Sequence, residues 1–251
     1  MIDILLSAFM VSLILLGINS YFGLEIIRRG IIFTDLAIGQ MAALGAAISL
    51  FAFDGAFLYP ISLGFSLLAG LIIAMISHKG NNVEAFIGLI YAFGFAAVYV
   101  LLSKSYHGME TFQKLMAADI LFTPLEEIIT TALLYAVLGL FIYFVLRKTK
   151  GFIKDILFFI TFSITVTSAV KLAGVLVLFA LLVAPALIAT ILKRGIPLIN
   201  AWIIGIVINI VSIVVSYQFD FPTGYTIVFL NALTALIVSM AARNKLKTQV
   251  Q

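Results

Sequence analysis

Residues 174–192 read G-V-L-V-L-F-A-L-L-V-A-P-A-L-I-A-T-I-L and contain no charged side chain. A transmembrane helix needs about 20 consecutive apolar residues to cross the hydrocarbon core of a bilayer. In lipid, backbone N–H and C=O groups must find internal partners, so such a long continuous run predicts a spanning helix. A barrel strand would instead alternate polar and apolar residues over about ten positions.

The composition of the whole chain indicates the same class. Of its 251 residues, 64% are hydrophobic and 10% are charged, and the mean hydropathy is +1.24. Soluble domains carry about 25% charged residues, so lipid must cover part of this apolar surface. The chain has no cysteine, which excludes disulfides and thiolate metal sites. We predict an all-α, polytopic helix bundle that forms a single transmembrane domain over residues 1–251.

Charges, polar runs and Gly/Pro clusters divide the chain into eight to nine candidate spans. The sixth and seventh are separated only by residues 171–174, which suits a tight helical hairpin. No basic segment precedes the first span, so we expect a retained helix and no signal peptide. Residues 104–125 are too polar to span, and a short surface helix is expected there. The spans lie near 4–27, 32–53, 57–77, 84–103, 126–146, 156–171, 174–192, 198–217 and 223–241.

Basic side chains are concentrated in alternate connections between these spans. Those connections hold twelve of the fifteen Lys and Arg residues, and the other face holds Lys104, Lys114 and Lys171. By the positive-inside rule the basic connections are cytoplasmic. We therefore predict a multi-pass protein of the cell (inner) membrane, with the N-terminus outside and the C-terminus in the cytoplasm. The net charge of +4 reflects this asymmetry and does not indicate nucleic-acid binding.

The sequence lacks the motifs of the common membrane-associated enzymes. There is no G-x-x-x-x-G-K-[ST] phosphate loop, no H-E-x-x-H zinc motif and no G-x-S-x-G nucleophile motif. A bundle of many spans without a catalytic constellation favours transport. The energy for uphill transport must then come from an ion gradient or from a separate ATPase.

The few polar residues within the spans are candidate functional residues. Asp35 and Gln40 lie in the second span, where intramembrane polar groups tend to mark substrate pathways. A simple helix-packing hydrogen bond is the alternative. Glu25 precedes Arg28 and Arg29 by about one turn, which predicts an interfacial ion pair.

Other polar and helix-breaking residues have mainly structural interpretations. Glu84 opens the fourth span, where a carboxylate stabilises the positive end of the helix dipole. Pro185 removes one helical hydrogen bond from the seventh span and predicts a bend. Asn209 and Asn231 suit hydrogen bonds between helices. Residues 220–224 read D-F-P-T-G and predict a turn before the last span.

Several strings, taken in order, resemble the permease subunits of ABC importers for zinc, manganese and iron. They are L-E-I-I-R-R-G (24–30), F-T-D-L-A-I-G-Q-M-A-A-L-G (33–45), E-A-F-I-G (84–88), D-I-L-F (119–122), K-L-A-G-V-L-V-L-F-A-L-L-V-A-P-A (171–186) and D-F-P-T-G (220–224). The resemblance covers nearly the whole chain. It implies a type II importer fold in which two copies of the permease surround one pathway.

The same resemblance implies partners and site residues. Two cytoplasmic ATPase subunits would bind the ATP, this chain would hold no cofactor, and an external binding protein would deliver the metal. Residues 147–155 would meet the ATPase through Lys148, Lys150 and Lys154. The pathway would include Asp35, Gln40 and Pro185, with Asp35 as the candidate metal ligand and Glu84 at a cytoplasmic gate.

The sequence departs from the family pattern at two places. The family's second span commonly carries Asp-x-x-x-His, and these positions fall here on Leu36 and Gln40, with Asp35 one residue earlier. One residue rotates a helical side chain by about 100°, and an amide is a poorer ligand than imidazole for zinc-like ions. The loop after the fifth span, residues 148–155, is also short for a coupling helix.

Two other functions remain open at the level of the sequence. A secondary carrier driven by protons or sodium would use Asp35 and Glu84 as coupling carboxylates. A membrane scaffold without transport activity would tolerate Asp35→Asn and Gln40→Ala.

Overall fold

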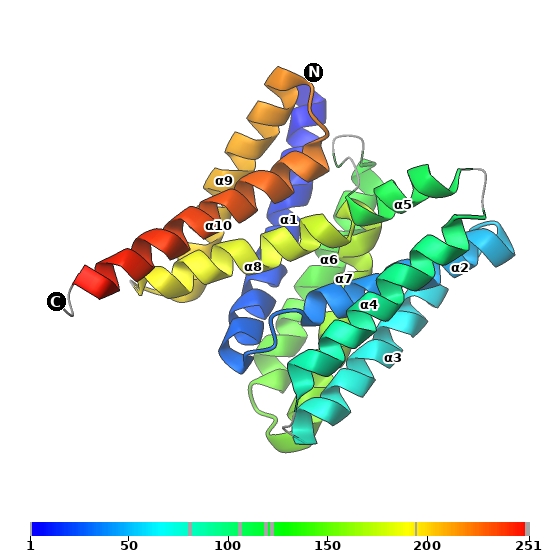
Figure 1. Ribbon diagram of the computed structural model, residues 1–251, viewed down its shortest axis with the longest axis horizontal. Coiled ribbons are helices and arrows are strands. Elements are labelled where there is room, and N and C mark those ends of the chain that lie inside the picture. Colours follow the sequence, from blue (N-terminus) through cyan, green and yellow to red (C-terminus); the bar gives the residue numbers. More distant parts are fainter. Residues whose placement is uncertain are drawn as a thin grey trace.

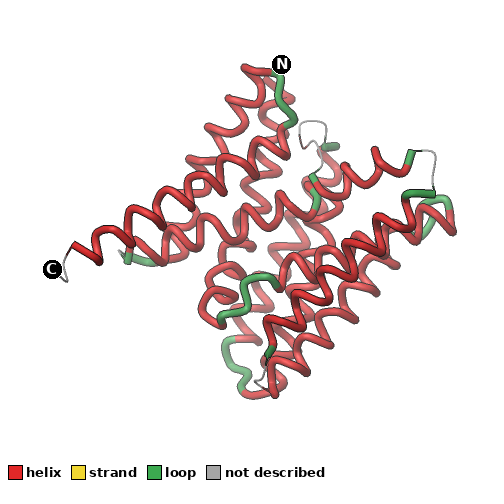
Figure 2. The backbone as a smooth tube through the Cα atoms, viewed as in Figure 1, coloured by secondary structure: helices red, strands yellow, loops and turns green. Residues whose placement is uncertain are grey.

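A computed structural model of the chain describes residues 2–79, 82–104, 107–117, 120, 123–193 and 195–248. Within these ranges, the backbone but not the side chains is described for residues 2–5, 79, 109 and 243–248. Throughout these residues the secondary structure is helical, and short loops join the helices (Figures 1 and 2). The elements are α1 (Ile2–Arg29), α2 (Thr34–Phe53), α3 (Leu58–Lys79), α4 (Val83–Leu102), α5 (Gly108–Met116), α6 (Leu125–Phe141), the π-helix η2 (Ile142–Leu146), α7 (Gly151–Ala173), α8 (Val175–Leu192), α9 (Pro197–Phe219) and α10 (Thr223–Thr248).

Among the described residues, nine helical segments are long and apolar enough to cross a membrane. This confirms the all-α polytopic bundle and selects nine spans from the predicted range of eight to nine. The fifth span combines α6 with η2 over Leu125–Leu146. The sixth and seventh spans, α7 and α8, are joined by Gly174 alone, which has a φ of 85°. This left-handed φ favours glycine and produces the tight hairpin.

The polar segment after the fourth span contains the expected short surface helix, α5. The turn at its far end packs closely on the α7–α8 connection. A Cβ on Gly174 would lie 2.7 Å from the carbonyl oxygen of Met116. Asp119, part of the family resemblance, lies outside the described residues. Glycine at position 174 thus permits both the hairpin and the close approach of α5.

The three most buried spans, α2, α7 and α8, form the centre of the bundle. Helix α2 packs against α3, α4, α7 and α8, and α1 packs against α8 and α9. In Figure 1, α9 and α10 stand on one side of α8 and the group α2–α4 on the other. The outer spans α4, α6, α9 and α10 expose long rows of apolar side chains, as lipid-facing helices do.

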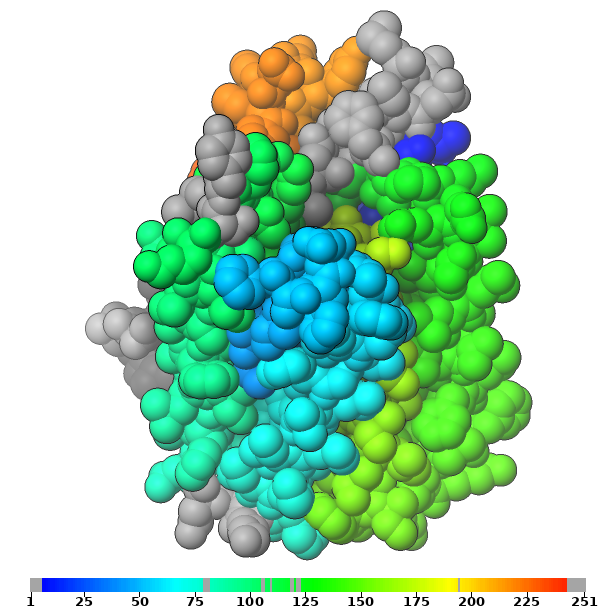
Figure 3. All heavy atoms as spheres, turned by 90° about the vertical axis from the view of Figure 1, so that its right-hand side faces the viewer, coloured from blue at the N-terminus to red at the C-terminus, as the bar shows by residue number. Residues whose placement is uncertain are grey.

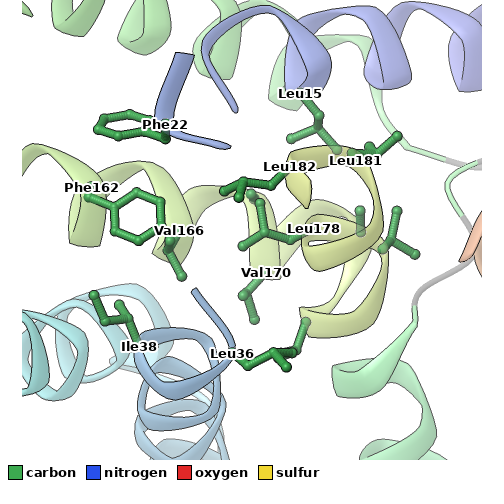
Figure 4. Close-up of a cluster of buried hydrophobic side chains, with 14 of the residues drawn as sticks. Leu15, Phe22, Leu36, Ile38, Phe162, Val166, Val170, Leu178, Leu181 and Leu182 are labelled. Carbon is green, nitrogen blue, oxygen red and sulfur yellow. The ribbon is translucent and has the colours of Figure 1, made fainter. Parts of the chain in front are cut away.

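The core between the central helices is aromatic and aliphatic (Figure 4). Phe22 of α1 lies 4.8 Å, ring centre to ring centre, from Phe162 of α7. Leu178 and Leu182 of α8 are fully buried beside this cluster. Because lipid tails are as apolar as these side chains, close packing holds such a core together.

Polar side chains form hydrogen bonds between neighbouring helices. Ser66 of α3 and Thr167 of α7 are hydrogen-bonded at 2.6 Å, and Ser163 donates to the Ser66 carbonyl oxygen at 3.0 Å. Between α9 and α10, the amide of Asn231 donates to Asn209 Oδ1 at 3.2 Å. The contact between Asn231 and Asn209 confirms that these two residues form an interhelical hydrogen bond.

The ends of the spans define two faces of the bundle. At one face, α1, α3, η2 and α8 end and α4, α7 and α9 begin. We refer to this face as the basic end. Arg28 and Arg29 are both hydrogen-bonded to Glu25 there, which confirms the predicted ion pair. Arg194 lies outside the described residues, as do the side chains of the basic residues after Ala242. The prediction that the basic end faces the cytoplasm stays a prediction.

Candidate substrate pathway and energy-coupling site

The candidate pathway residues lie on α2, which is enclosed by neighbouring helices. Every residue from Thr34 to Gln40 is buried. Glycine and alanine on α2 make this possible because they let the backbones of the surrounding helices approach closely. A Cβ on Gly45 would lie 2.7 Å from the carbonyl oxygen of Ile61 on α3. A polar side chain on α2 is therefore enclosed by protein.

Asp35 is buried in the first turn of α2. Its residue is 1% exposed, and neither carboxyl oxygen has a hydrogen-bond partner among the described residues. The first turn of a helix has free backbone N–H groups and a positive dipole end, which favour a carboxylate. Burial of a carboxyl group without a specific partner is costly. A cation, a proton or water is the kind of partner that would satisfy Asp35.

Gln40 lies about 1.4 turns further along α2 and faces α4 and α5. Its Nε2 atom is 3.4 Å from the sulfur of Met116 on α5, and its Oε1 atom has no partner among the described residues. A Cβ on Gly94 of α4 would lie 2.9 Å from Gln40 Cβ. Gln40 is thus fixed between three helices and retains one free acceptor oxygen.

Asp35 and Gln40 share a helix without forming one ligand cluster. Five residues separate them, which places their side chains about 140° apart around the helix axis. In the described part of the chain there is also no group of three or more His, Asp or Glu residues that could hold a metal ion. The prediction that both residues face one pathway, with Asp35 as a metal ligand, therefore stays a prediction.

Glu84 joins two helices at the basic end. It lies in the first turn of α4, as predicted, and its Oε1 atom accepts a hydrogen bond of 3.3 Å from the backbone N–H of Phe33. Phe33 is the residue that precedes α2. The second carboxyl oxygen of Glu84 is buried without a partner among the described residues. Glu84 therefore connects the start of α4 to the start of α2, a role that the sequence did not indicate.

Pro185 is buried in α8, and the helix continues on both sides of it from Val175 to Leu192. Proline lacks a backbone N–H, so one carbonyl in the preceding turn loses its helical partner. Gly23 of α1 lies against the carbonyl of Leu182 in that same turn, too close for any Cβ. The predicted bend at Pro185 stays a prediction, but the close contact with α1 places Pro185 at a helix crossing.

The connection after the fifth span is shorter than the sequence suggested. We expected residues 148–155 to separate two spans, but α7 begins at Gly151 and the link consists of residues 147–150. Lys148 and Lys150 are exposed in this link, whereas Lys154 lies in the first turn of α7 and is half-buried. In the second turn of α7, Asp155 meets Arg29 at the end of α1.

One ion-pair network holds that junction. Arg29 Nη1 is 2.7 Å from Asp155 Oδ1, and Arg29 Nε is 3.1 Å from Glu25 Oε1. The Arg29 guanidinium also lies 4.3 Å from the centre of the Phe158 ring. Asp155 is therefore engaged with α1, and the sequence offered no signal for this long-range pair. In the described part of the chain, the basic groups of the link at positions 147, 148 and 150 have no carboxylate partner.

Comparison with known proteins supports a transporter fold. Residues 149–242 match the model of the ABC 3 transport family. The chain superposes with a TM-score of 0.77 on PsaBC from Streptococcus pneumoniae, solved in complex with a Fab, at 20% identity over 94% of this chain and 90% of that chain. Residues 149–242 therefore carry the sequence signature of this family, and the chain has the fold of the solved PsaBC structure. The family resemblance predicted from the sequence is thereby confirmed.

Two further proteins that are similar to this chain are more distant or less characterised. An inward-facing transporter assigned to the metal-chelate ABC type superposes with a TM-score of 0.66 at 15% identity, over 96% of this chain and 85% of that chain. An uncharacterised membrane protein of the ycf23-apcF intergenic region of Cyanophora paradoxa is 24% identical, over 86% of this chain and 81% of its own length.

At the end opposite the basic end, the bundle has a polar recess that sequence reasoning missed. Two adjoining cavities of about 580 Å³ each share Tyr59, Glu127 and Lys171 in their walls. Lys171 Nζ is 3.1 Å from Glu127 Oε1, and the buried Ser62 Oγ has no partner among the described residues. Figure 3 shows this side, where α3 in cyan and α6 in green flank α7 in yellow-green. The sequence signal that could have indicated this recess is the opposite charge of residues 127 and 171, which are far apart in the chain.

Proposed function

We propose that this chain is the membrane subunit of an ABC importer that carries a divalent metal ion, zinc, manganese or iron, across the cell membrane. The observation that carries the proposal is the buried, unpartnered carboxyl group of Asp35 on a helix enclosed by protein. Divalent cations are bound by carboxylate and other oxygen or nitrogen ligands. The ABC-3 signature and fold support the transporter class.

The pathway in this proposal follows α2. Asp35 and Gln40 contact the ion in successive positions, and Pro185 on α8 supplies backbone with a free carbonyl. Glu84 acts as the cytoplasmic gate, because its hydrogen bond to the backbone of Phe33 holds the starts of α2 and α4 together. Gln40 offers an amide oxygen where a histidine would bind zinc-like ions more firmly. Weak contact at this position suits an ion that must also leave.

Energy comes from a separate cytoplasmic ATPase in this proposal, and that partner binds the ATP. The absence of a phosphate loop in the sequence is consistent with this division. Lys148, Lys150 and Lys154 form the docking surface together with the short link before α7. An external metal-binding protein delivers the ion, and two copies of the permease enclose the pathway. Lipid surrounds the assembly.

Metal uptake by living cells tests the proposal. Cells that lack the chain are complemented with the wild type, with Asp35→Asn or with Asp54→Asn, and uptake of radiolabelled zinc, manganese and iron is compared. Asp54 is the matched control, because it is an exposed aspartate at the other end of the same helix. Asp35→Asn should lower uptake of one metal at least tenfold, whereas Asp54→Asn should not. Equal uptake by all three strains would refute the role of Asp35.

A secondary carrier is the second candidate, and a specific observation favours it. Among the described residues, Glu84 and Asp35 both have buried carboxyl oxygens without a hydrogen-bond partner, which is the arrangement expected of proton-coupling groups. The four-residue link at 147–150 also leaves little surface for an ATPase. Uptake that stops when the membrane potential is collapsed, with cellular ATP maintained, would favour this alternative.

A further inference from the structure

An apolar groove runs along the outside of the bundle between α1, α6–η2 and α9. Its volume is about 590 Å³, and its walls are mainly aliphatic and aromatic. This size lies within the range of about 300–1,000 Å³ that is typical of ligand sites. All three walls belong to spanning helices, so the groove opens to the hydrocarbon region of the membrane. The pathway residues on α2 do not line it.

Two glycines on facing helices leave the middle of the groove open. At both Gly17 of α1 and Gly139 of α6, no atom lies within 4 Å of the place that a Cβ would occupy. Gly23, also on α1, is different, because it lies directly against the backbone of α8. Glycine weakens the interior of a helix relative to alanine, so a helix crossing normally explains it. At Gly17 and Gly139 no neighbouring helix fills the Cβ position, and this space fits a bound chain.

A cation without a carboxylate partner lies at the basic end of the groove. The Arg147 guanidinium is 5.3 Å from the centre of the Tyr143 ring, and both residues line the groove. Among the described residues Arg147 has no acidic partner, whereas Arg28 and Arg29 are both paired with Glu25. Guanidinium groups bind phosphate in a bidentate manner. Basic pockets between spanning helices are typical sites for anionic lipid head groups.

The helix changes its winding just before this arginine. The backbone N–H of Arg147 donates to the carbonyl of Ile142, five residues earlier, at 3.2 Å. This π-helical turn, η2, brings Tyr143 and Arg147 to the groove. Short π-helical turns cost helical hydrogen bonding and occur frequently at functional sites.

We propose that this groove binds one anionic phospholipid, with an acyl chain against Gly17 and Gly139 and the phosphate at Arg147. The open glycines, the apolar walls and the unpaired guanidinium each match one part of such a molecule. The proposal is independent of the transported substrate and of the ATPase.

The single tryptophan of the chain reports on the groove directly. Trp202 of α9 lines it and is held in place, because its Nε1–H donates to the Gly17 carbonyl oxygen at 2.9 Å. Brominated acyl chains quench tryptophan fluorescence on contact. The full chain is reconstituted in phosphatidylcholine vesicles that contain a small fraction of either brominated phosphatidylglycerol or brominated phosphatidylcholine. We expect the anionic lipid to quench Trp202 at least threefold more strongly at equal low mole fraction.

The head-group contact is tested with Arg147→Gln, which should remove the preference for phosphatidylglycerol. Lys148→Gln is the control, because it removes the same charge from the next residue, which does not line the groove. Vesicles without ATPase separate this readout from any docking role of the link. Equal quenching by the two lipids in the wild type, or an unchanged preference in Arg147→Gln, would overturn the proposal.

The acyl-chain contact is tested with Gly139→Leu, which fills the groove, and with the milder Gly139→Ala. Leucine should at least halve the quenching by phosphatidylglycerol, and alanine should have a smaller effect in the same direction. Gly88→Leu on α4 is the control, because it also points into open space but lies outside the groove. Full quenching in Gly139→Leu would contradict the assignment. A wild-type Trp202 that neither lipid quenches would mean that protein covers the groove, which also overturns it.

Discussion

Gly94 offers a sharp test of how α4 packs on α2. A Cβ at this position would lie 2.9 Å from Gln40 Cβ, 3.2 Å from the Gln40 carbonyl carbon and 3.4 Å from its oxygen. All three atoms belong to the backbone of α2 or to the base of a side chain, so they cannot move aside without the helix. Any larger residue at 94 must therefore push α4 away from α2.

The magnitude follows from two opposing effects. Overpacking of a close contact costs about 1–3 kcal/mol, whereas replacing glycine by alanine within a helix gains up to about 1 kcal/mol. Gly94→Ala should therefore be close to neutral or mildly destabilising. Gly94→Val should be destabilised by most of the overpacking cost. For a chain of this size, 1 kcal/mol shifts the melting temperature by about 2–4 °C, so Gly94→Val should melt roughly 4–10 °C below the wild type.

Thermal unfolding of the detergent-solubilised full chain measures these shifts. Gly88→Ala and Gly88→Val on the same helix are the matched controls, since no atom lies within 4 Å of a Cβ there. They should equal or exceed the wild type in melting temperature. If Gly94→Val were as stable as Gly88→Val, the close packing of α4 on Gln40 would be refuted.

Three further predictions concern individual contacts. A double-mutant cycle of Asn209→Leu and Asn231→Leu should give a coupling energy of about 0.6 kcal/mol in chemical unfolding, as for other intramembrane hydrogen bonds. A coupling energy of zero would show that this hydrogen bond does not stabilise the fold. Glu84→Gln should retain most metal uptake because its side-chain oxygen can still accept a hydrogen bond from the backbone N–H of Phe33. Glu84→Ala should lower uptake several-fold. Equal uptake by the two variants would contradict the role of this hydrogen bond. Charge reversal of Lys150 and Lys154 should weaken ATPase-coupled uptake, and normal uptake would refute the docking assignment.

The spans could be predicted from the sequence because their signal is local. A run such as residues 174–192 specifies a spanning helix by length and composition alone. The short hairpin at Gly174 could also be predicted, since only residues 171–174 separate the two apolar runs. The pairing of Asp155 with Arg29 could not be predicted, because the two residues lie 126 positions apart in the chain.

The candidate site was predictable as a set of residues but not as a geometry. Asp35 and Gln40 stand out in sequence because polar groups are rare within spans. Their separation around the helix axis follows from spacing, but the contact of Gln40 with Met116 depends on where α5 folds back. The recess at Glu127 and Lys171 depends in the same way on tertiary packing of α6 beside α7.

The source of energy for transport tests the central claim most directly. Uptake of the transported metal is measured in cells that carry the full chain, once with ATP depleted and once with the proton and sodium gradients collapsed by ionophores while ATP is maintained. An ABC importer permease predicts that uptake stops when ATP is depleted and persists when the gradients are collapsed. Uptake that follows the gradients and is indifferent to ATP would contradict the account.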